Sequence, residues 1–180
     1  AFLVDAYRNK TQEYGFIHYC LFVSFFPQLI AGPIVHHKEM LSQFMRSETF
    51  RVSTRNFAIG LSIFTIGLFK KVVLADGIAI YSTPVFTAAD KGAELLFYDA
   101  WAGNLAYAFQ IYFDFSGYSD MAIGLGLMMG FLFPINFNSP LKSRSTTEFC
   151  QRWHLSPSTW LRDYLSRPMG GNCTGPGTHT

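Results

Sequence analysis

The chain has 180 residues, of which 49% are hydrophobic, 17% aromatic and 14% charged. Soluble globular domains carry about 25% charged residues, so this composition favours a membrane protein. The formal net charge is only +2, which excludes the strongly basic surface that nucleic-acid binding needs. Cys20, Cys150 and Cys173 show no paired spacing, so we expect neither disulfides nor a metal site.

Two apolar runs predict membrane-spanning helices. Residues 15–34 and 121–141 contain no Asp, Glu, Lys or Arg, over about the length that a helix needs to cross roughly 30 Å of hydrocarbon. In the amphipathic helix of a soluble domain, polar residues recur about every 3.6 residues and form one face. These runs lack that pattern. We therefore expect an all-α fold, a multi-spanning transmembrane helical bundle with re-entrant or interfacial helices.

The first run is followed by a polar loop at 36–55 and a second predicted span at 56–75. This span ends near Lys70 and Lys71, whose long side chains are expected to reach a membrane interface. The next segment, 77–89, contains Pro84 and is either an interfacial or a re-entrant piece.

Further apolar helices are predicted at 95–115 and 121–133, after a loop at 90–94. We expect them to be separated or kinked at Ser116 and Gly117. Prolines end helices because they lack an N–H group and crowd the preceding turn, so Pro134 and Pro140 should end the second helix.

Loop charges give a partial orientation. The loop at 36–55 is rich in Lys and Arg, whereas 88–99 is acidic. By the positive-inside rule, the first loop is cytoplasmic and the second external. Segment 142–167 is also basic, yet two full spans between 95 and 133 would return it to the outside. We favour a cytoplasmic-side, partly re-entrant placement, while the side of the membrane stays open.

The segment that follows carries a helix-start signal. Ser145 to Glu148 has the S-x-x-E form of a capping box, and Glu148 and Arg152 are spaced to form an i,i+4 ion pair. A second short helix is predicted to begin with Ser156 as its N-cap. His154 would then lie at the end of the first helix, where backbone carbonyls favour the protonated imidazole.

Three residues are candidates for chemistry. Asp114 and Asp120 flank Gly117 in an apolar context, where an ionisable group is costly and therefore a functional candidate. They line a polar tunnel or pair with Arg144 or Arg152; alternatively, they cap helix ends around Gly117. His154 is a general base or positions a substrate; alternatively, it is a structural histidine at a helix end.

Three motifs make a family resemblance specific. They are SFFPQLIAGPI at 24–34, DFSGYSD at 114–120 and RWHLSPSTWLRDYL at 152–165. With them the chain resembles the membrane-bound O-acyltransferase family, and within it the alginate O-acetylation membrane proteins and their teichoic-acid D-alanylation relatives. The likeness covers about 1–175, so we expect 1–180 to be the central part of one such domain, with its N- and C-terminal parts missing.

The resemblance implies a multi-pass enzyme of the cytoplasmic (inner) membrane. It would move an acyl group, usually acetyl, from a cytoplasmic thioester donor toward an extracytoplasmic polysaccharide such as alginate. The implied donor is acetyl-CoA or an acyl carrier, with no bound cofactor. The implied partners are the lipid bilayer, a donor or carrier protein and a separate extracytoplasmic polysaccharide acyltransferase. Two alternatives stay open: D-alanyl transfer to teichoic acid, and a noncatalytic membrane transporter or scaffold.

The resemblance also implies site residues. His154 in the R-W-H segment would be catalytic. The substrate channel would be lined by Asp114, Ser116, Tyr118, Asp120, Arg152, Trp153 and Ser156. The family carries a second histidine in a W-H-G context, the residue most often assigned as catalytic. That context is absent here, because His179 stands in T-H-T. We therefore expect His154 to be required but not sufficient, and this chain alone to be inactive.

Overall fold

The computed structural model describes residues 7, 16–28, 32, 37–46, 49, 53–167 and 169. Every regular element in these residues is helical, which confirms the all-α prediction for this part of the chain. In chain order the elements are α2 (Phe16–Ser24), η1 (Phe26–Gln28), α3 (His37–Phe44), α4 (Thr54–Phe69), η2 (Lys70–Ala75), α5 (Asp76–Asp90), α6 (Phe97–Met128), η3 (Pro140–Lys142), α7 (Thr146–Cys150), α8 (Leu155–Leu161) and η4 (Arg162–Ser166).

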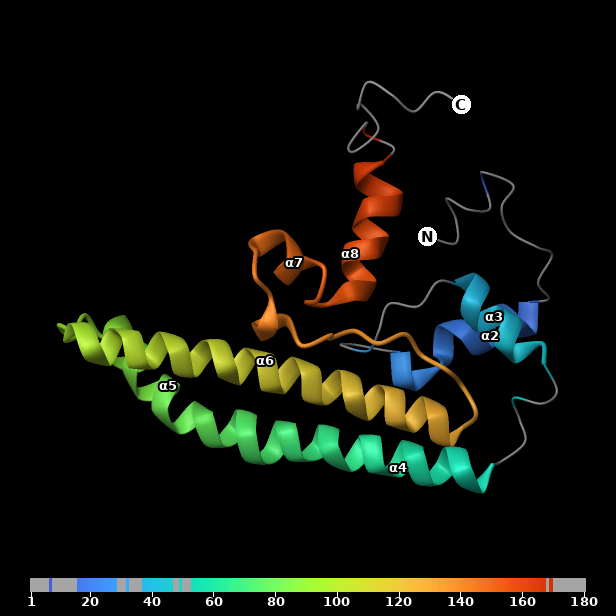
Figure 1. Ribbon diagram of the computed structural model, residues 1–180, viewed down its shortest axis with the longest axis horizontal. Helices are drawn as coiled ribbons and strands as arrows, with labels where there is room; N and C mark the ends of the chain where they lie inside the picture. The colour runs from blue at the N-terminus through green and yellow to red at the C-terminus, as the bar shows by residue number, and fades with distance from the viewer. Residues whose placement is uncertain are drawn as a thin grey trace. The chain divides into compact units, whose positions relative to one another are not determined.

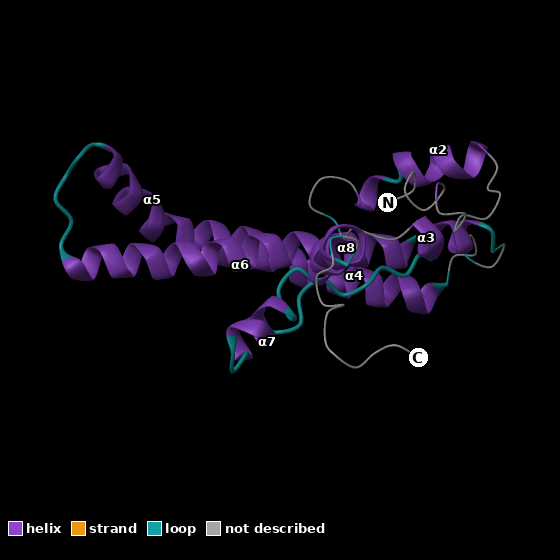
Figure 2. Cartoon of the chain, turned by 90° about the horizontal axis from the view of Figure 1, so that it is seen from above, coloured by secondary structure: helices purple, strands orange, loops and turns teal. Residues whose placement is uncertain are grey.

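The chain divides into two compact units. One comprises residues 53–128, and the other comprises residues 1–52 together with 129–180. The first unit is a helical hairpin, in which α4, η2 and α5 join into one helix that runs beside α6 (Figures 1 and 2). The second unit holds the short helices and His154.

The continuous helix Thr54–Asp90 has 37 residues, or about 55 Å at 1.5 Å per residue. Within the described residues it is the one helix whose length and apolar composition would let it cross a membrane. The segments predicted separately at 56–75 and 77–89 thus form one helix. Its middle, η2, is π-helical, and Pro84 lies within α5 without ending it.

The first predicted span is shorter than expected. In place of a helix over 15–34, α2 has nine residues, about 14 Å, which is less than a bilayer requires. The short turn η1 follows, and it contains Pro27. A proline inside a helix removes a hydrogen bond and crowds the preceding turn, which gives the physical reason for the early end of α2.

Helix α6 differs from the prediction at both of its expected breaks. It runs without interruption through Ser116 and Gly117 and ends at Met128, so 121–141 is not one helix. The chain turns at Gly130, which has a φ of +88°. Glycine adopts this left-handed conformation without steric cost and commonly ends helices. The helix therefore stops before Pro134 is reached.

Paired glycines set the register of the hairpin. A methyl group added at Gly60 would lie 2.6 Å from the carbonyl oxygen of Gly124, and one added at Gly67 would lie 2.6 Å from that of Gly117. Gly60 and Gly67 are seven residues apart on one helix, as are Gly117 and Gly124 on the other. The two backbones thus meet at two levels, in the way that small residues allow in membrane helix pairs.

The core of the second unit is aromatic. Phe25, Phe44 and Phe131 form a cluster with ring centroids 4.7–5.4 Å apart, and each is less than 10% exposed. The Gln43 amide holds the extended segment 131–137 in place. Its Nε2 donates to the Leu132 carbonyl at 3.0 Å, and its Oε1 accepts from the Leu132 N–H at 2.8 Å.

Candidate active site

The predicted cap begins the helix that precedes His154. Ser145 is the N-cap of α7, and its Oγ accepts a hydrogen bond from the Glu148 N–H at 3.1 Å. The returning bond differs from a standard capping box, because the Glu148 carboxylate accepts from the N–H of Arg144 at 2.7 Å. That hydrogen bond, together with the guanidinium of Arg152 at 2.8 Å, lowers the pKa of Glu148. The predicted i,i+4 ion pair is confirmed.

The next helix starts earlier than predicted. The N-cap of α8 is His154, where Ser156 was expected, and Pro157 lies inside the first turn. His154 has φ +47° and ψ +63°, a left-handed conformation that costs an L-residue about 1–2 kcal/mol. Such outliers persist only where the surrounding structure determines them, and they concentrate at functional sites.

Hydrogen bonds hold the chain on both sides of His154. The N–H of Asn138 donates to the Arg152 carbonyl, and the N–H of Leu155 donates to the Asn136 carbonyl, both at 2.9 Å. Ser156 donates to Oδ1 of Asn136 from its N–H at 3.1 Å and from its hydroxyl at 2.9 Å. The extended segment at 136–138 therefore fixes the entry into α8.

The imidazole lies at one end of an aromatic cluster. The rings of His154 and Phe137 stack with centroids 6.0 Å apart, and Trp153 packs edge-on against Phe137 at 5.2 Å. Phe149 stacks on Trp153 at 5.4 Å, as their helical spacing predicted. Burial among these groups lowers the pKa of His154 below its ordinary value of 6.5. The prediction of a protonated imidazole at a helix C-terminus is therefore wrong, because His154 begins a helix and is half-buried.

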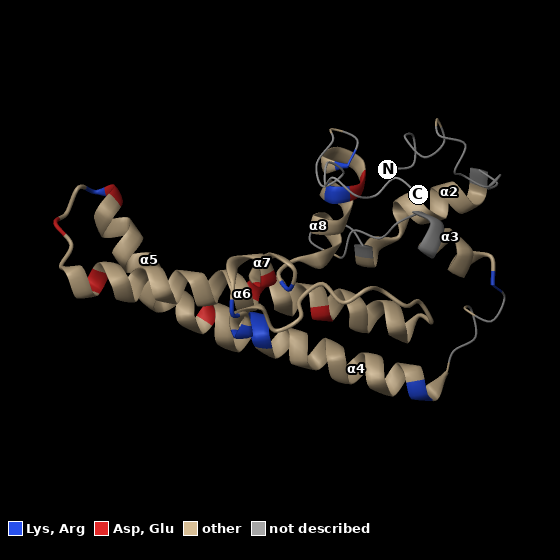
Figure 3. Cartoon of the chain, turned by 45° about the horizontal axis from the view of Figure 1, so that its top comes forward, with Lys and Arg blue, Asp and Glu red and all other residues tan. Residues whose placement is uncertain are grey.

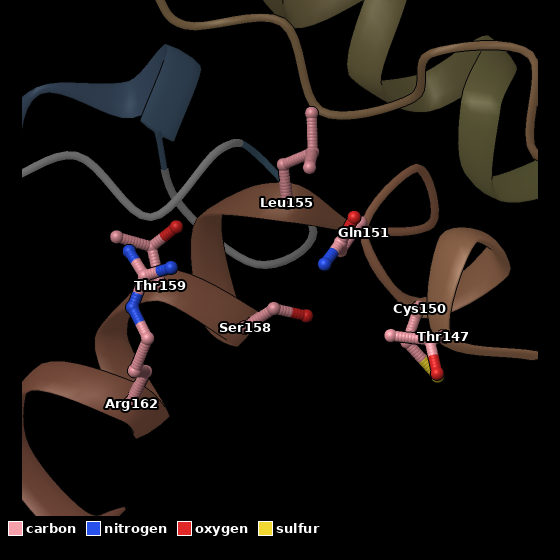
Figure 4. Close-up of a pocket in the computed structure, with 7 residues that line it drawn as sticks. All are labelled: Thr147, Cys150, Gln151, Leu155, Ser158, Thr159 and Arg162. Atoms are coloured by element: carbon pink, nitrogen blue, oxygen red, sulfur yellow. The ribbon is translucent and has the colours of Figure 1, made fainter. Parts of the chain in front are cut away.

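A pocket of about 420 Å³, with a mainly apolar lining, lies beside this segment, between α7 and α8. Figure 4 shows Ser158 of α8 pointing toward Gln151, with Cys150 and Thr147 together on α7. Its lining consists of Thr147, Cys150, Gln151, Leu155, Ser158, Thr159 and Arg162. The lining combines a mainly apolar surface with hydroxyl, amide and guanidinium groups, an arrangement suited to a ligand that has both apolar and polar parts.

The two candidate aspartates lie on α6, in the hairpin unit. Asp120 pairs with Lys70 at 2.6 Å, and Asp114 pairs with Lys71 at 2.5 Å. Both lysines belong to η2, midway along a helix that is otherwise nearly uncharged (Figure 3). The partners are therefore lysines and not the expected arginines. The aspartates also do not cap helix ends, since α6 continues through Gly117. We predicted from the sequence that these lysines would reach a membrane interface. In the structure they bind the two carboxylates instead.

The other two candidates on α6 differ in exposure. Ser116 is 1% exposed, and neither its Oγ nor that of Ser119 has a hydrogen-bond partner within the described part of the chain. Tyr118 is half-buried. Arg152, Trp153 and His154 are consecutive in the second unit, where Ser156 is hydrogen-bonded to Asn136.

Sequence reasoning missed three contributors. Asn136 was overlooked, although an amide between Ile135 and Phe137 in an apolar stretch was a usable signal. The partners of the aspartates, Lys70 and Lys71, were noted only as interfacial residues. No group of three or more His, Cys, Asp or Glu side chains that could hold a metal ion occurs in the residues that the structure describes.

Comparison with known proteins gives the family. The model of the membrane-bound O-acyltransferase family matches residues 3–177. A peptidoglycan O-acetyltransferase of Helicobacter pylori is 55% identical over 157 residues, which are 87% of this chain and 29% of that protein. A probable alginate O-acetylase of Pseudomonas aeruginosa is 49% identical over 173 residues, 96% of this chain and 32% of that protein.

A more distant relative is the teichoic acid D-alanyltransferase of Bacillus subtilis, which is 30% identical over 147 residues, 80% of this chain and 36% of that protein. The chain thus spans about a third of the length of the curated relatives it matches. The family match covers nearly the whole chain, including the R-W-H segment. The chain belongs to the membrane-bound O-acyltransferase family.

Proposed function

We propose that the intact protein transfers an acetyl group from a thioester to a hydroxyl group of an exported or cell-envelope polysaccharide, with His154 as the general base. The observation that carries this proposal is the state of His154. Its backbone is held in a left-handed conformation, and burial lowers its pKa. A neutral imidazole at pH 7 is ready to accept a proton from a hydroxyl.

The proposed reaction has one proton to move. The acceptor hydroxyl gives its proton to the His154 imidazole while its oxygen attacks the thioester carbonyl carbon. The bond between that carbon and sulfur then breaks, and the departing thiolate takes up the proton. The products are an O-acetyl ester and a free thiol, and the imidazole returns to its neutral form.

Acetyl is favoured over D-alanyl as the transferred group. The peptidoglycan and alginate relatives, both named for O-acetylation, are 55% and 49% identical to this chain, whereas the D-alanyltransferase is 30% identical. The acceptor class is therefore a polysaccharide such as peptidoglycan or alginate. The donor is acetyl-CoA or an acetylated carrier protein, supplied from the cytoplasm.

The proposed setting is a multi-pass protein of the cytoplasmic membrane, with 1–180 as the central part of its acyltransferase domain. The long apolar helix Thr54–Asp90 supports a membrane location. We further propose that Asp114, Ser116, Tyr118, Asp120, Arg152, Trp153 and Ser156 line the path of the substrates. An extracytoplasmic acyltransferase would complete delivery to the polymer.

The test uses membrane vesicles that contain the intact protein together with the extracytoplasmic acyltransferase. Vesicles receive radiolabelled acetyl-CoA with purified peptidoglycan or alginate, and matched vesicles receive a D-alanyl carrier protein with teichoic acid. The proposal expects alkali-labile acetyl label in one of the polysaccharides. Label only from the D-alanyl donor would favour the second reaction, and a transporter or scaffold would give no protein-dependent label in any polymer.

A further inference from the structure

Asn136 is a fully buried polar residue that contacts the chain immediately after His154. Its exposure is 0%. Oδ1 accepts two hydrogen bonds from Ser156, and the backbone carbonyl accepts one from Leu155. One residue of the extended segment thus binds both residues that follow His154.

An amide is a costly choice at this position. Nδ2 of Asn136 is buried and has no hydrogen-bond partner in the described residues, although burial of an unsatisfied donor is unfavourable. An apolar side chain would avoid that cost but would offer no acceptor to Ser156. The favourable part of the amide is therefore Oδ1, which satisfies the Ser156 N–H and hydroxyl together.

These bonds determine the backbone of His154. Its left-handed conformation is rarely adopted by residues other than glycine, and it needs neighbours that are held on both sides. Asn138 holds Arg152 on one side, and Asn136 holds Leu155 and Ser156 on the other. Loss of the two side-chain bonds to Ser156 would leave only the backbone bond to Leu155 on the second side. His154 could then leave the conformation that stacks its ring on Phe137.

We infer that Asn136 is a positioning residue for His154, which fixes the left-handed turn and thereby the direction of the imidazole. This inference rests on the proposed function only for its effect on acyl transfer. The placement of the ring can be measured separately. Asn136 acts on His154 through Ser156 and does not itself meet the substrate, since its side chain is fully buried.

The titration of His154 reports on that placement. Burial lowers its pKa, so a ring that moved into water would titrate at higher pH. The charged groups on the adjoining helices pair with one another: Glu148 with Arg152 in the α7 segment, and Asp163 with Arg162 and Arg167 in η4. A change in titration would therefore reflect burial of the ring.

The experiment compares three variants of the intact protein in membranes: Asn136→Ala, Asn136→Asp and Asn138→Ala. His154 is titrated by its reaction with diethyl pyrocarbonate over a pH series, with modified peptides measured by mass spectrometry. Asn138→Ala is the matched control, because the hydrogen bonds recorded for Asn138 run through its backbone.

Asn136→Ala is expected to shift the titration of His154 to higher pH and to lower kcat by up to about 100-fold, the cost of displacing a reacting group by about 1 Å, with little change in KM for the donor. Asn136→Asp keeps an acceptor for Ser156 and should retain more activity than Asn136→Ala. Asn138→Ala should leave the titration unchanged.

An unchanged titration in Asn136→Ala, or an equal shift in Asn138→Ala, would overturn the inference. If Asn136→Ala does not accumulate in the membrane, Ser156→Ala takes its place. This variant removes only the hydroxyl bond to Asn136, so the titration of His154 should shift less, in the same direction. An unchanged titration in Ser156→Ala would also overturn the inference. If Asn136→Ala shifts the titration while His154→Ala transfers normally, the positioning role stands and the proposed function fails.

Discussion

Lys70 Nζ and Asp120 Oδ2 lie 2.6 Å apart and join the π-helical segment η2 to α6. Both side chains are only about a quarter exposed, at 27% and 28%. Lys71 pairs in the same region with Asp114 and, at 3.1 Å, with Asp76. Single-turn π segments in α-helices are frequent at functional sites. Here the segment places two adjacent lysines against carboxylates of the facing helix.

The Lys70–Asp120 pair should show energetic coupling. Lys70→Met leaves the Asp120 charge without its partner, and Asp120→Leu does the reverse, so each change should destabilise the hairpin. The double variant should be more stable than the sum of the two losses predicts, with a coupling free energy on the order of 1–3 kcal/mol. Denaturant unfolding of the purified protein in detergent measures this coupling. Additive losses would show that the pair contributes nothing of its own.

The close approach at Gly67 predicts a steric effect. Gly67→Ala places a methyl group 2.6 Å from the Gly117 carbonyl oxygen, which the backbone cannot relieve without separating the helices. The unfolding free energy should fall by about 1–3 kcal/mol.

Gly77→Ala is the matched control for this change, because a methyl group at Gly77 has no atom within 4 Å. Alanine is the better helix former, so this variant should gain up to about 1 kcal/mol. Equal effects of the two substitutions would contradict the packing described here.

The cap of α7 should control local stability around 146–154. Ser145→Ala removes the acceptor for the Glu148 N–H and should cost about 1 kcal/mol. Hydrogen exchange of the α7 amides should become faster, whereas Thr146→Ala, at an exposed first-turn position, should change it little. Unaltered exchange in Ser145→Ala would show that the cap does not hold this helix.

The lowered pKa of His154 predicts the pH dependence of transfer. A general base acts in its deprotonated form, so kcat/KM should rise with pH through the lowered pKa and become level near pH 7. The same shift favours folding above the unfolded-state pKa, and that contribution is lost as the pH falls through the folded-state pKa. Initial rates between about pH 5 and 8 should give a midpoint below 6.5, the ordinary value. A midpoint above that value would contradict a buried neutral base.

Local patterns predicted part of this structure correctly. Ser145 with Glu148, Glu148 with Arg152, and Phe149 with Trp153 all lie three or four residues apart, so helix geometry alone brings them together. The structure confirms these contacts. The all-α class was also predicted correctly, although the apolar runs at 15–34 and 121–141 do not form the two helices expected of them.

The predictions were wrong where the local structure depends on residues far apart in the sequence. Gly117 looked like a helix break, but it lies inside α6 because it packs against Gly67, 50 residues earlier. Asp120 pairs with Lys70, at the same separation. The start of α8 depends on Asn136, 20 residues before Ser156. Spacing along a helix cannot reveal such partners, so the surroundings of His154 could be predicted only in part.

The most direct test of the catalytic role of His154 is acyl transfer by the intact protein with His154→Ala, measured as labelled acetyl groups in the polysaccharide and normalised to the amount of protein in the membrane. His18→Ala, which alters a histidine on α2, serves as the control. We expect His154→Ala to abolish transfer at near-normal membrane abundance, because the loss of a half-buried ring should not open a large cavity. His18→Ala should transfer normally. Normal transfer by His154→Ala, or a loss only in proportion to lost protein, would show that His154 is structural.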